Sequence, residues 1–179
     1  PPCQAVLMAK TYSPPTGTPL SHLLRAPQGP VNVSELPTDI TPGYPGKGKK
    51  DAFAARHALE PQLSELQERL YADGRSQPEA AKRILVVLQG MDTSGKGGVI
   101  RHAIGLVDPQ GVHIRAFKAP TKEELSHPFL WRITNGLPAA GMIGIFDRSQ
   151  YEDVLIVRVE ERVPPDVWEA RYDAINAWE

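Results

Sequence analysis

Apolar positions recur along the chain with two different spacings, which predict helices alternating with strands. Between residues 51 and 73, leucines recur at steps of four, three and four, as expected for one face of an amphipathic helix. These leucines are Leu59, Leu63, Leu66 and Leu70. Gly74 is expected to end this helix, and Pro61 predicts a kink or a second start within it.

Three short stretches have the pattern of strands. Residues 83–89 form a continuous apolar run, which is typical of a central parallel strand buried on both faces. Residues 111–120 alternate between apolar and polar positions, and residues 141–147 form a second buried run. Helical patterns lie between and after these stretches, at 97–107, 121–138, 151–163 and 166–178. This alternation predicts an α/β fold with a mostly parallel sheet.

The first 50 residues differ from the rest of the chain. They contain ten of its 18 prolines and no sustained periodicity, which predicts a proline-rich arm over residues 1–50. Residues 51–179 then form one α/β domain, a size that allows a hydrophobic core.

Composition narrows the classes of function. The net charge of −1 argues against a surface that coats nucleic acid, so any anion site must be local. A single cysteine, Cys3, excludes an internal disulfide framework and gives no zinc cluster. We find neither an apolar run long enough to span a membrane nor a leader resembling a signal peptide. We therefore expect a cytoplasmic protein.

The stretch LQGMDTSGKGG, at residues 88–98, has the pattern of a phosphate-binding loop. Gly90, Gly95 and Lys96 satisfy G-x-x-x-x-G-K between a predicted strand and a predicted helix. Backbone N–H groups at a helix N-terminus attract anions, and glycines such as Gly97 and Gly98 let a phosphate approach closely. Lys96 adds a mobile ammonium group.

Two departures from the usual loop point to the metal that it uses. Gly97 replaces the Ser or Thr whose hydroxyl binds Mg²⁺, and Asp92 places a carboxylate within the loop. Asp147 ends the run 141–147, where phosphotransferases hold Mg²⁺. Because Mg²⁺ needs only one or two carboxylates, we predict that Asp92 and Asp147 hold one or two Mg²⁺ ions.

Several cations occur near these residues along the sequence. Arg148 directly follows Asp147 at the end of the strand, and Arg132 lies in an aromatic cluster. The others are Arg101, Arg115, Lys118 and Lys122. A set of cations around one phosphate loop suits a long anionic substrate better than a single nucleotide.

Four motifs together resemble the polyphosphate kinase 2 family. They are GMDTSGKGG, DPQGVHIRAFKAPTKEE, HPFLWRI and IGIFDRSQYEDVLIVRVEERV, within a likeness that runs from about residue 25 to 179. The resemblance implies a P-loop NTPase-like three-layer sandwich with a helical lid. It also implies an enzyme that moves phosphate between inorganic polyphosphate and a nucleotide: AMP, ADP, ATP or a guanine nucleotide. The FDRS form and the proline-rich arm look most like members that phosphorylate AMP, or AMP and ADP.

The resemblance also assigns roles to residues. It implies that Asp92, Lys96, Asp147 and Arg148 carry catalysis with Mg²⁺. Arg132 and nearby lysines such as Lys122 are implied in the polyphosphate channel.

The sequence departs from the family at its end, since the family continues through another core strand and the lid. We therefore expect residues 51–179 to be an incomplete kinase-like catalytic domain that exposes an apolar surface and a sheet edge, and that forms homo-oligomers. Two alternatives stay open. One is an ATP-dependent nucleoside or nucleotide kinase, against which Gly97 counts; the other is an inactive, truncated fragment that binds phosphate.

Overall fold

The computed structural model describes residues 19–26, 28–37, 39–44, 46 and 48–179. Cys3 and much of the predicted arm lie outside these residues. The chain divides into two compact units, Pro1–Ala54 and Ala55–Glu179. In its described part the first unit contains helix α2 (Leu20–Leu23), the 3-10 turn η1 (Val33–Glu35) and the first residues of a longer helix, α3 (Lys49–Ser76).

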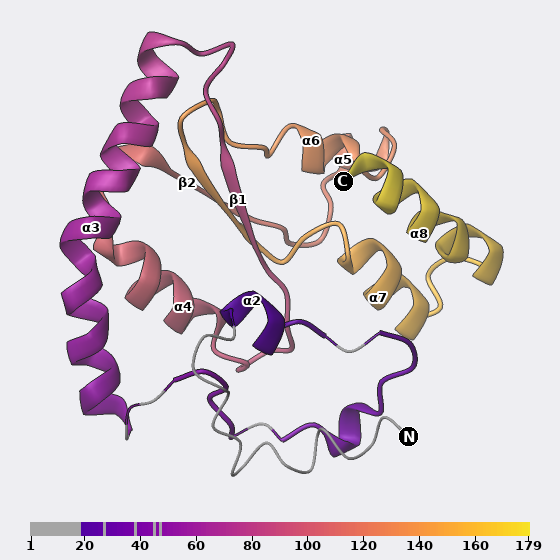
Figure 1. The fold of residues 1–179 in the computed structure, drawn as a ribbon. Coiled ribbons are helices and arrows are strands. Elements are labelled where there is room, and N and C mark those ends of the chain that lie inside the picture. Colours follow the sequence, from indigo (N-terminus) through magenta and orange to yellow (C-terminus); the bar gives the residue numbers. More distant parts are fainter. Residues whose placement is uncertain (1–18, 27, 38, 45, 47) are drawn as a thin grey trace. The chain divides into compact units, whose positions relative to one another are not determined.

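The second unit alternates strands and helices, which confirms the predicted α/β fold. Its elements are α3 (Lys49–Ser76, which starts in the first unit), β1 (Ile84–Leu88), α4 (Lys96–Ala103), η2 (Ile104–Leu106), η3 (Pro109–Gly111), β2 (Val112–Ala116), α5 (Lys122–Leu125), α6 (Trp131–Thr134), β3 (Ile143–Asp147), α7 (Glu152–Val159) and α8 (Pro165–Trp178). Within this unit α4 lies on one side of the strands, and α7 and α8 lie on the other (Figure 1). The arrangement is the expected three-layer sandwich.

The sheet places β3 in the middle. Its order is β1-β3-β2, and both pairings are parallel. Four of the five β3 residues are buried, whereas Ile84 at the start of β1 is 47% exposed. The prediction that residues 83–89 form the central strand is therefore wrong for the described part of the chain, where β1 pairs on one edge only.

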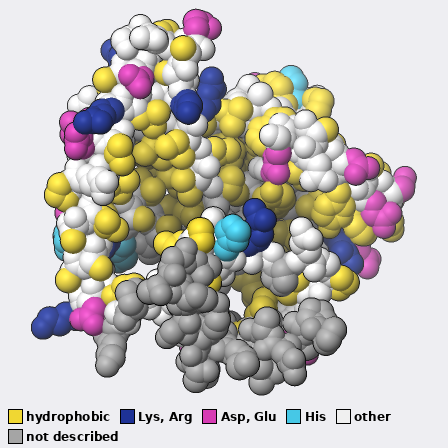
Figure 2. Space-filling view, in the orientation of Figure 1, with side chains coloured by type: hydrophobic (Ala, Val, Ile, Leu, Met, Phe, Trp, Pro, Cys, Tyr) yellow, Lys and Arg dark blue, Asp and Glu magenta, His cyan; other side chains and the backbone are white. Residues whose placement is uncertain are grey.

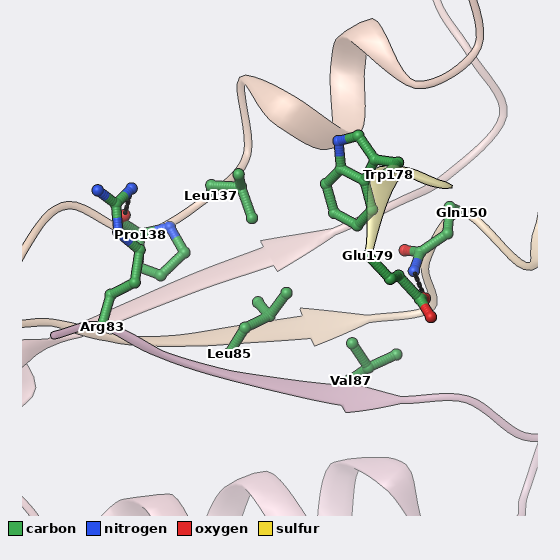
Figure 3. A pocket seen from close by; sticks show the side chains of 8 residues that line it. All are labelled: Arg83, Leu85, Val87, Leu137, Pro138, Gln150, Trp178 and Glu179. Carbon is green, nitrogen blue, oxygen red and sulfur yellow. Dashed lines mark hydrogen bonds between the residues drawn. The ribbon is translucent and has the colours of Figure 1, made fainter. Parts of the chain in front are cut away.

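A groove of about 420 Å³ runs beside β1 (Figure 3). Leu85, Val87, Leu137 and Trp178 give it an apolar wall. At one end Gln150 donates from Nε2 to Glu179 Oε1 at 2.7 Å, while its buried Oε1 has no partner. The groove gives this part of the molecule an apolar surface, and β1 stands at the end of the strand order, paired with β3 alone.

The core lies between the sheet and the helices that follow β2. Phe117 and Phe146 meet edge to face, with ring centroids 4.8 Å apart, and Ile133 completes the buried cluster. Phe146 is the residue of β3 that precedes Asp147, so the same packing that fixes the core also fixes the end of the strand.

Helix α3 is longer and more exposed than its pattern predicted. It continues through Pro61 without interruption, and Leu59 and Leu66 on its apolar stripe are 59% and 55% exposed. Apolar side chains reach the surface along α3 in the space-filling view (Figure 2). Its one buried residue is Gln67, which packs against Gly111. Among the described residues no helix combines the length and the apolar composition needed to cross a bilayer.

Gly74 serves a different purpose from the predicted helix end. Helix α3 runs on to Ser76, and a Cβ atom at Gly74 would lie 2.4 Å from the Ala140 carbonyl oxygen. Facing it, Gly141 has φ +78°, and a Cβ there would lie 2.6 Å from the Gly74 Cα. The two glycines let the helix backbone contact the turn that leads into β3.

This contact predicts the effect of Gly141→Ala. A positive φ costs a non-glycine residue roughly 1–3 kcal/mol, and the steric overlap with Gly74 adds to that cost. We expect a loss of at least about 2 kcal/mol in the free energy of unfolding, measured by urea denaturation. Gly105→Ala is the control, since a Cβ atom there meets nothing within 4 Å. Equal stability of the two variants would contradict the proposed contact.

Candidate active site

The parallel register brings the glycine loop and Asp147 to the same edge of the sheet. Leu88, the last residue of β1, is opposite Asp147, and Ala116 of β2 is opposite Asp147 on the other side. Beyond the strands, the Arg148 N–H donates to the Leu88 carbonyl at 3.0 Å, and the Phe117 N–H donates to the Asp147 carbonyl at 3.0 Å. The segments that follow β1, β2 and β3 therefore leave the sheet side by side.

The loop ends at a helix N-terminus, as predicted. Gly95 has φ +97° and directly precedes α4, whose first residue is Lys96. The positions of Gly97 and Gly98 face open space, because a Cβ atom at either would meet nothing within 4 Å. Free N–H groups of the first helical turn beside open space can accommodate a phosphate.

Lys96 lies across the loop that it follows. Its Nζ donates to the carbonyls of Gly90 and Met91 at 2.8 and 2.9 Å. The ammonium group is thus held over the glycine loop, where a phosphate oxygen could replace one of these carbonyls as its hydrogen-bond acceptor.

Asp147 presents a carboxylate oxygen that lacks a partner. Its Oδ1 is buried and accepts no hydrogen bond, although its strand neighbours are fully paired along the sheet. A buried carboxylate oxygen without a donor is costly, and a cation would offset that cost. Within the part of the chain that the structure describes, no group of three or more potential ligands forms a closed metal cage. The donor set suits a hard cation that keeps most of its waters.

Asp92 interacts with Arg148. The Arg148 Nη2 donates to Asp92 Oδ1 at 2.8 Å, in a pair whose side chains are 39% and 84% exposed. Arg148 itself has φ +65°, an uncommon backbone conformation for a bulky residue that is often found at functional sites. The four predicted catalytic residues thus lie around one sheet edge, with Arg148 linking Asp92 to the strand end that carries Asp147.

Sequence reasoning missed a hydrogen-bonded network behind this group. Gln89 donates from Nε2 to Glu152 Oε1 at 2.8 Å and accepts at Oε1 from the Ser149 hydroxyl at 3.0 Å. Ser149 is fully buried, and Glu152 Oε2 lies 3.9 Å from Arg148 Nη1. Gln89 directly precedes Gly90, and Glu152 is the first residue of α7. Their closeness to the glycine loop and to Asp147 along the sequence is the signal that could have identified them.

The two other predicted phosphate ligands have different environments. Lys122 is exposed at the start of α5. Arg132 has a side chain that is 7% exposed; it donates to the Lys118 carbonyl at 2.9 Å and to Asp153 Oδ2 at 3.4 Å. Arg132 and Arg148 both line one cavity of about 250 Å³.

Burial dominates the electrostatics of Asp153. It raises the pKa of the Asp153 carboxyl, although Arg132 and Arg171 act in the opposite direction. In α8, Arg171 donates to the Asp153 carbonyl at 2.7 Å. Arg132 and Arg171 therefore stabilise the buried Asp153 carboxylate, and their own positions are fixed by this interaction.

The fold, with a glycine loop between β1 and α4, is that of a P-loop protein. The family model described as polyphosphate kinase 2 matches residues 47–179. The chain therefore belongs to the polyphosphate kinase 2 family.

Individual relatives agree with this assignment. The AMP/ADP-polyphosphate phosphotransferase of Meiothermus ruber is 42% identical over 153 residues, which are 86% of this chain and 55% of that protein. The ADP-polyphosphate phosphotransferase of Rhodopseudomonas palustris is 39% identical, over 82% of this chain and 52% of that protein. The crystal structure of polyphosphate kinase 2 from Arthrobacter aurescens has a TM-score of 0.77 at 49% identity, covering 88% of this chain and 54% of that one. The chain thus spans about half the length of these relatives.

Proposed function

We propose that this chain carries the phosphate-transferring centre of a polyphosphate:nucleotide phosphotransferase that uses AMP or ADP. The observation behind the proposal is the unpartnered Asp147 oxygen at the sheet edge that also carries the glycine loop. Relatives with the printed activities of AMP/ADP- and ADP-polyphosphate phosphotransferases support the choice of substrates.

The proposed reaction is an in-line displacement. A phosphate oxygen of the nucleotide attacks the terminal phosphorus of polyphosphate, the bond from that phosphorus to the bridging oxygen breaks, and polyphosphate leaves one unit shorter. The attacking oxygen is already an anion, so no strong general base is required. Catalysis then consists of positioning and charge neutralisation.

Each residue of the site has a part in that neutralisation. The α4 N-terminus and Lys96 hold phosphate oxygens, and Arg148 contacts the equatorial oxygens of the transferred group. Asp147, with Asp92 on the loop, would hold Mg²⁺, which would supply positive charge against the phosphates. Arg148 can turn from Asp92 to the substrate at little cost, because exposed ion pairs contribute only about 0–1 kcal/mol.

An ATP-dependent nucleoside or nucleotide kinase would share the loop and Asp147. Such enzymes place a Ser or Thr after the loop lysine to bind Mg²⁺, and this chain has Gly97 there. The distinguishing measurement is a transfer assay with AMP, ADP or GDP as acceptor and either polyphosphate or ATP as donor. We expect AMP or ADP to be phosphorylated from polyphosphate. Transfer from ATP alone, or phosphate binding without any transfer, would contradict the proposal.

The two aspartates predict a second result. Asp92→Asn and Asp147→Asn should each lower the rate of transfer by about 100-fold or more, because each removes a carboxylate ligand of the cation that neutralises the phosphates. The double variant should be little worse than either single variant, since residues that act as a unit are not additive. Circular dichroism checks the fold, and Asp173→Asn, at an exposed position of α8, is the control. Near-normal turnover of Asp92→Asn would remove Asp92 from the site.

A further inference from the structure

We infer that Gln89 and Glu152 are positioning residues that fix the Arg148 guanidinium over the loop. The inference rests on the proposed function, in which Arg148 contacts the transferred phosphate. It concerns two side chains, one at the start of the loop and one just after β3, that are not among the residues predicted to bind phosphate.

The Arg148 guanidinium lies between two carboxylates. On one side Nη2 donates to Asp92, which is 84% exposed, and on the other side Nη1 faces Glu152, which is 17% exposed. Asp92 is on the loop and can turn away, whereas Glu152 is held at the start of α7. Glu152 is therefore the partner that remains when Arg148 turns to a substrate.

Glu152 is itself held in place by Gln89. Its Oε1 accepts from Gln89 Nε2 at 2.8 Å, so only Oε2 is left to face Arg148. A carboxylate pointing at phosphates would repel them. With one oxygen bonded to Gln89 and the other facing a guanidinium, Glu152 acts through Arg148.

The amide of Gln89 fits this place because it is both a donor and an acceptor. It donates to Glu152 and accepts from the Ser149 hydroxyl, which in turn accepts from the Tyr151 N–H at 3.3 Å. A glutamate at position 89 would face Glu152 with like charge, and a lysine would offer Ser149 no acceptor. The chain of bonds thus couples the start of the loop to the turn that carries Arg148.

The backbone of Arg148 makes this support necessary. Its φ of +65° and its N–H bond to Leu88 fix where the side chain begins, but the guanidinium is 39% exposed and several bonds away. Among the residues that the structure describes, loss of the Glu152 charge would leave Asp92 as the carboxylate paired with Arg148. The guanidinium would then pair with Asp92 alone and lose the position in which it contacts the transferred group.

The test is a double-mutant cycle on kcat for polyphosphate-dependent phosphorylation. Glu152→Gln should lower kcat by roughly 10- to 100-fold, the effect expected of a misplaced catalytic group, with little change in KM for the nucleotide. In an Arg148→Lys background the same substitution should cost less than about 2-fold, because the group on which it acts has been replaced. Equal losses in both backgrounds, or no loss in either, would overturn the inference.

Two further measurements keep the result decisive. Gln89→Met removes both hydrogen bonds of the side-chain amide without adding charge, and it should reproduce the loss in kcat. Glu169→Gln, at an exposed site of α8, is the control and should leave kcat unchanged. The side-chain ¹H–¹⁵N signal of Arg148 should move in Glu152→Gln and Gln89→Met but not in Glu169→Gln; an unmoved signal contradicts the inference even if Arg148→Lys is too slow to assay. An inactive wild-type protein would refute the proposed function, whereas an active one without coupling would refute this inference alone.

Discussion

The parallel pairing of β3 between β1 and β2 is the constraint on which the rest of the site depends. It sets Leu88, Asp147 and Ala116 side by side at the carboxyl ends of their strands. Everything that follows these residues in sequence must then leave the sheet at one edge: the glycine loop, Arg148, and the segment that begins with Phe117. The Phe117–Phe146 contact in the core lies next to these strand ends, so the packing of the core also fixes the position of Asp147.

Arg148, which is predicted to be catalytic, and Arg132, which is predicted to bind polyphosphate, differ in how deeply they are buried. Arg148 pairs with an exposed carboxylate, a contact of about 0–1 kcal/mol that a phosphate can replace. Arg132 is 7% exposed and shares Asp153, which is 14% exposed, with Arg171. Removing one partner from such a buried pair typically costs about 3–5 kcal/mol. Arg132 is accordingly better suited to holding the Lys118 segment beside the cavity than to exchanging partners during turnover.

The sequence was sufficient for the parts of the site that local chemistry determines. A glycine loop between an apolar run and a helix start must form a cradle, and an acid ending a second run must lie beside it if the strands are parallel. Strand order was harder, because residues 83–89 and 141–147 have equally apolar patterns and only long-range pairing distinguishes the central strand from the edge. Gln89 and Glu152 are 63 residues apart, a separation at which no local pattern signals contact. Gly74 predicts a helix end, but it allows a close backbone contact instead; both situations favour glycine, so the sequence does not distinguish them.

We propose that Asp147, with its buried and unpartnered oxygen, is the principal carboxylate ligand of a hard divalent cation. Binding of Mn²⁺, followed by loss of the free-ion electron paramagnetic resonance signal, tests it without any assay of turnover. Losing an outer-shell partner of a metal costs about 10- to 100-fold in affinity, and Asp147→Asn should cost at least as much. Asp173→Asn should bind Mn²⁺ as the wild-type protein does. Unchanged Mn²⁺ affinity in Asp147→Asn would contradict the account.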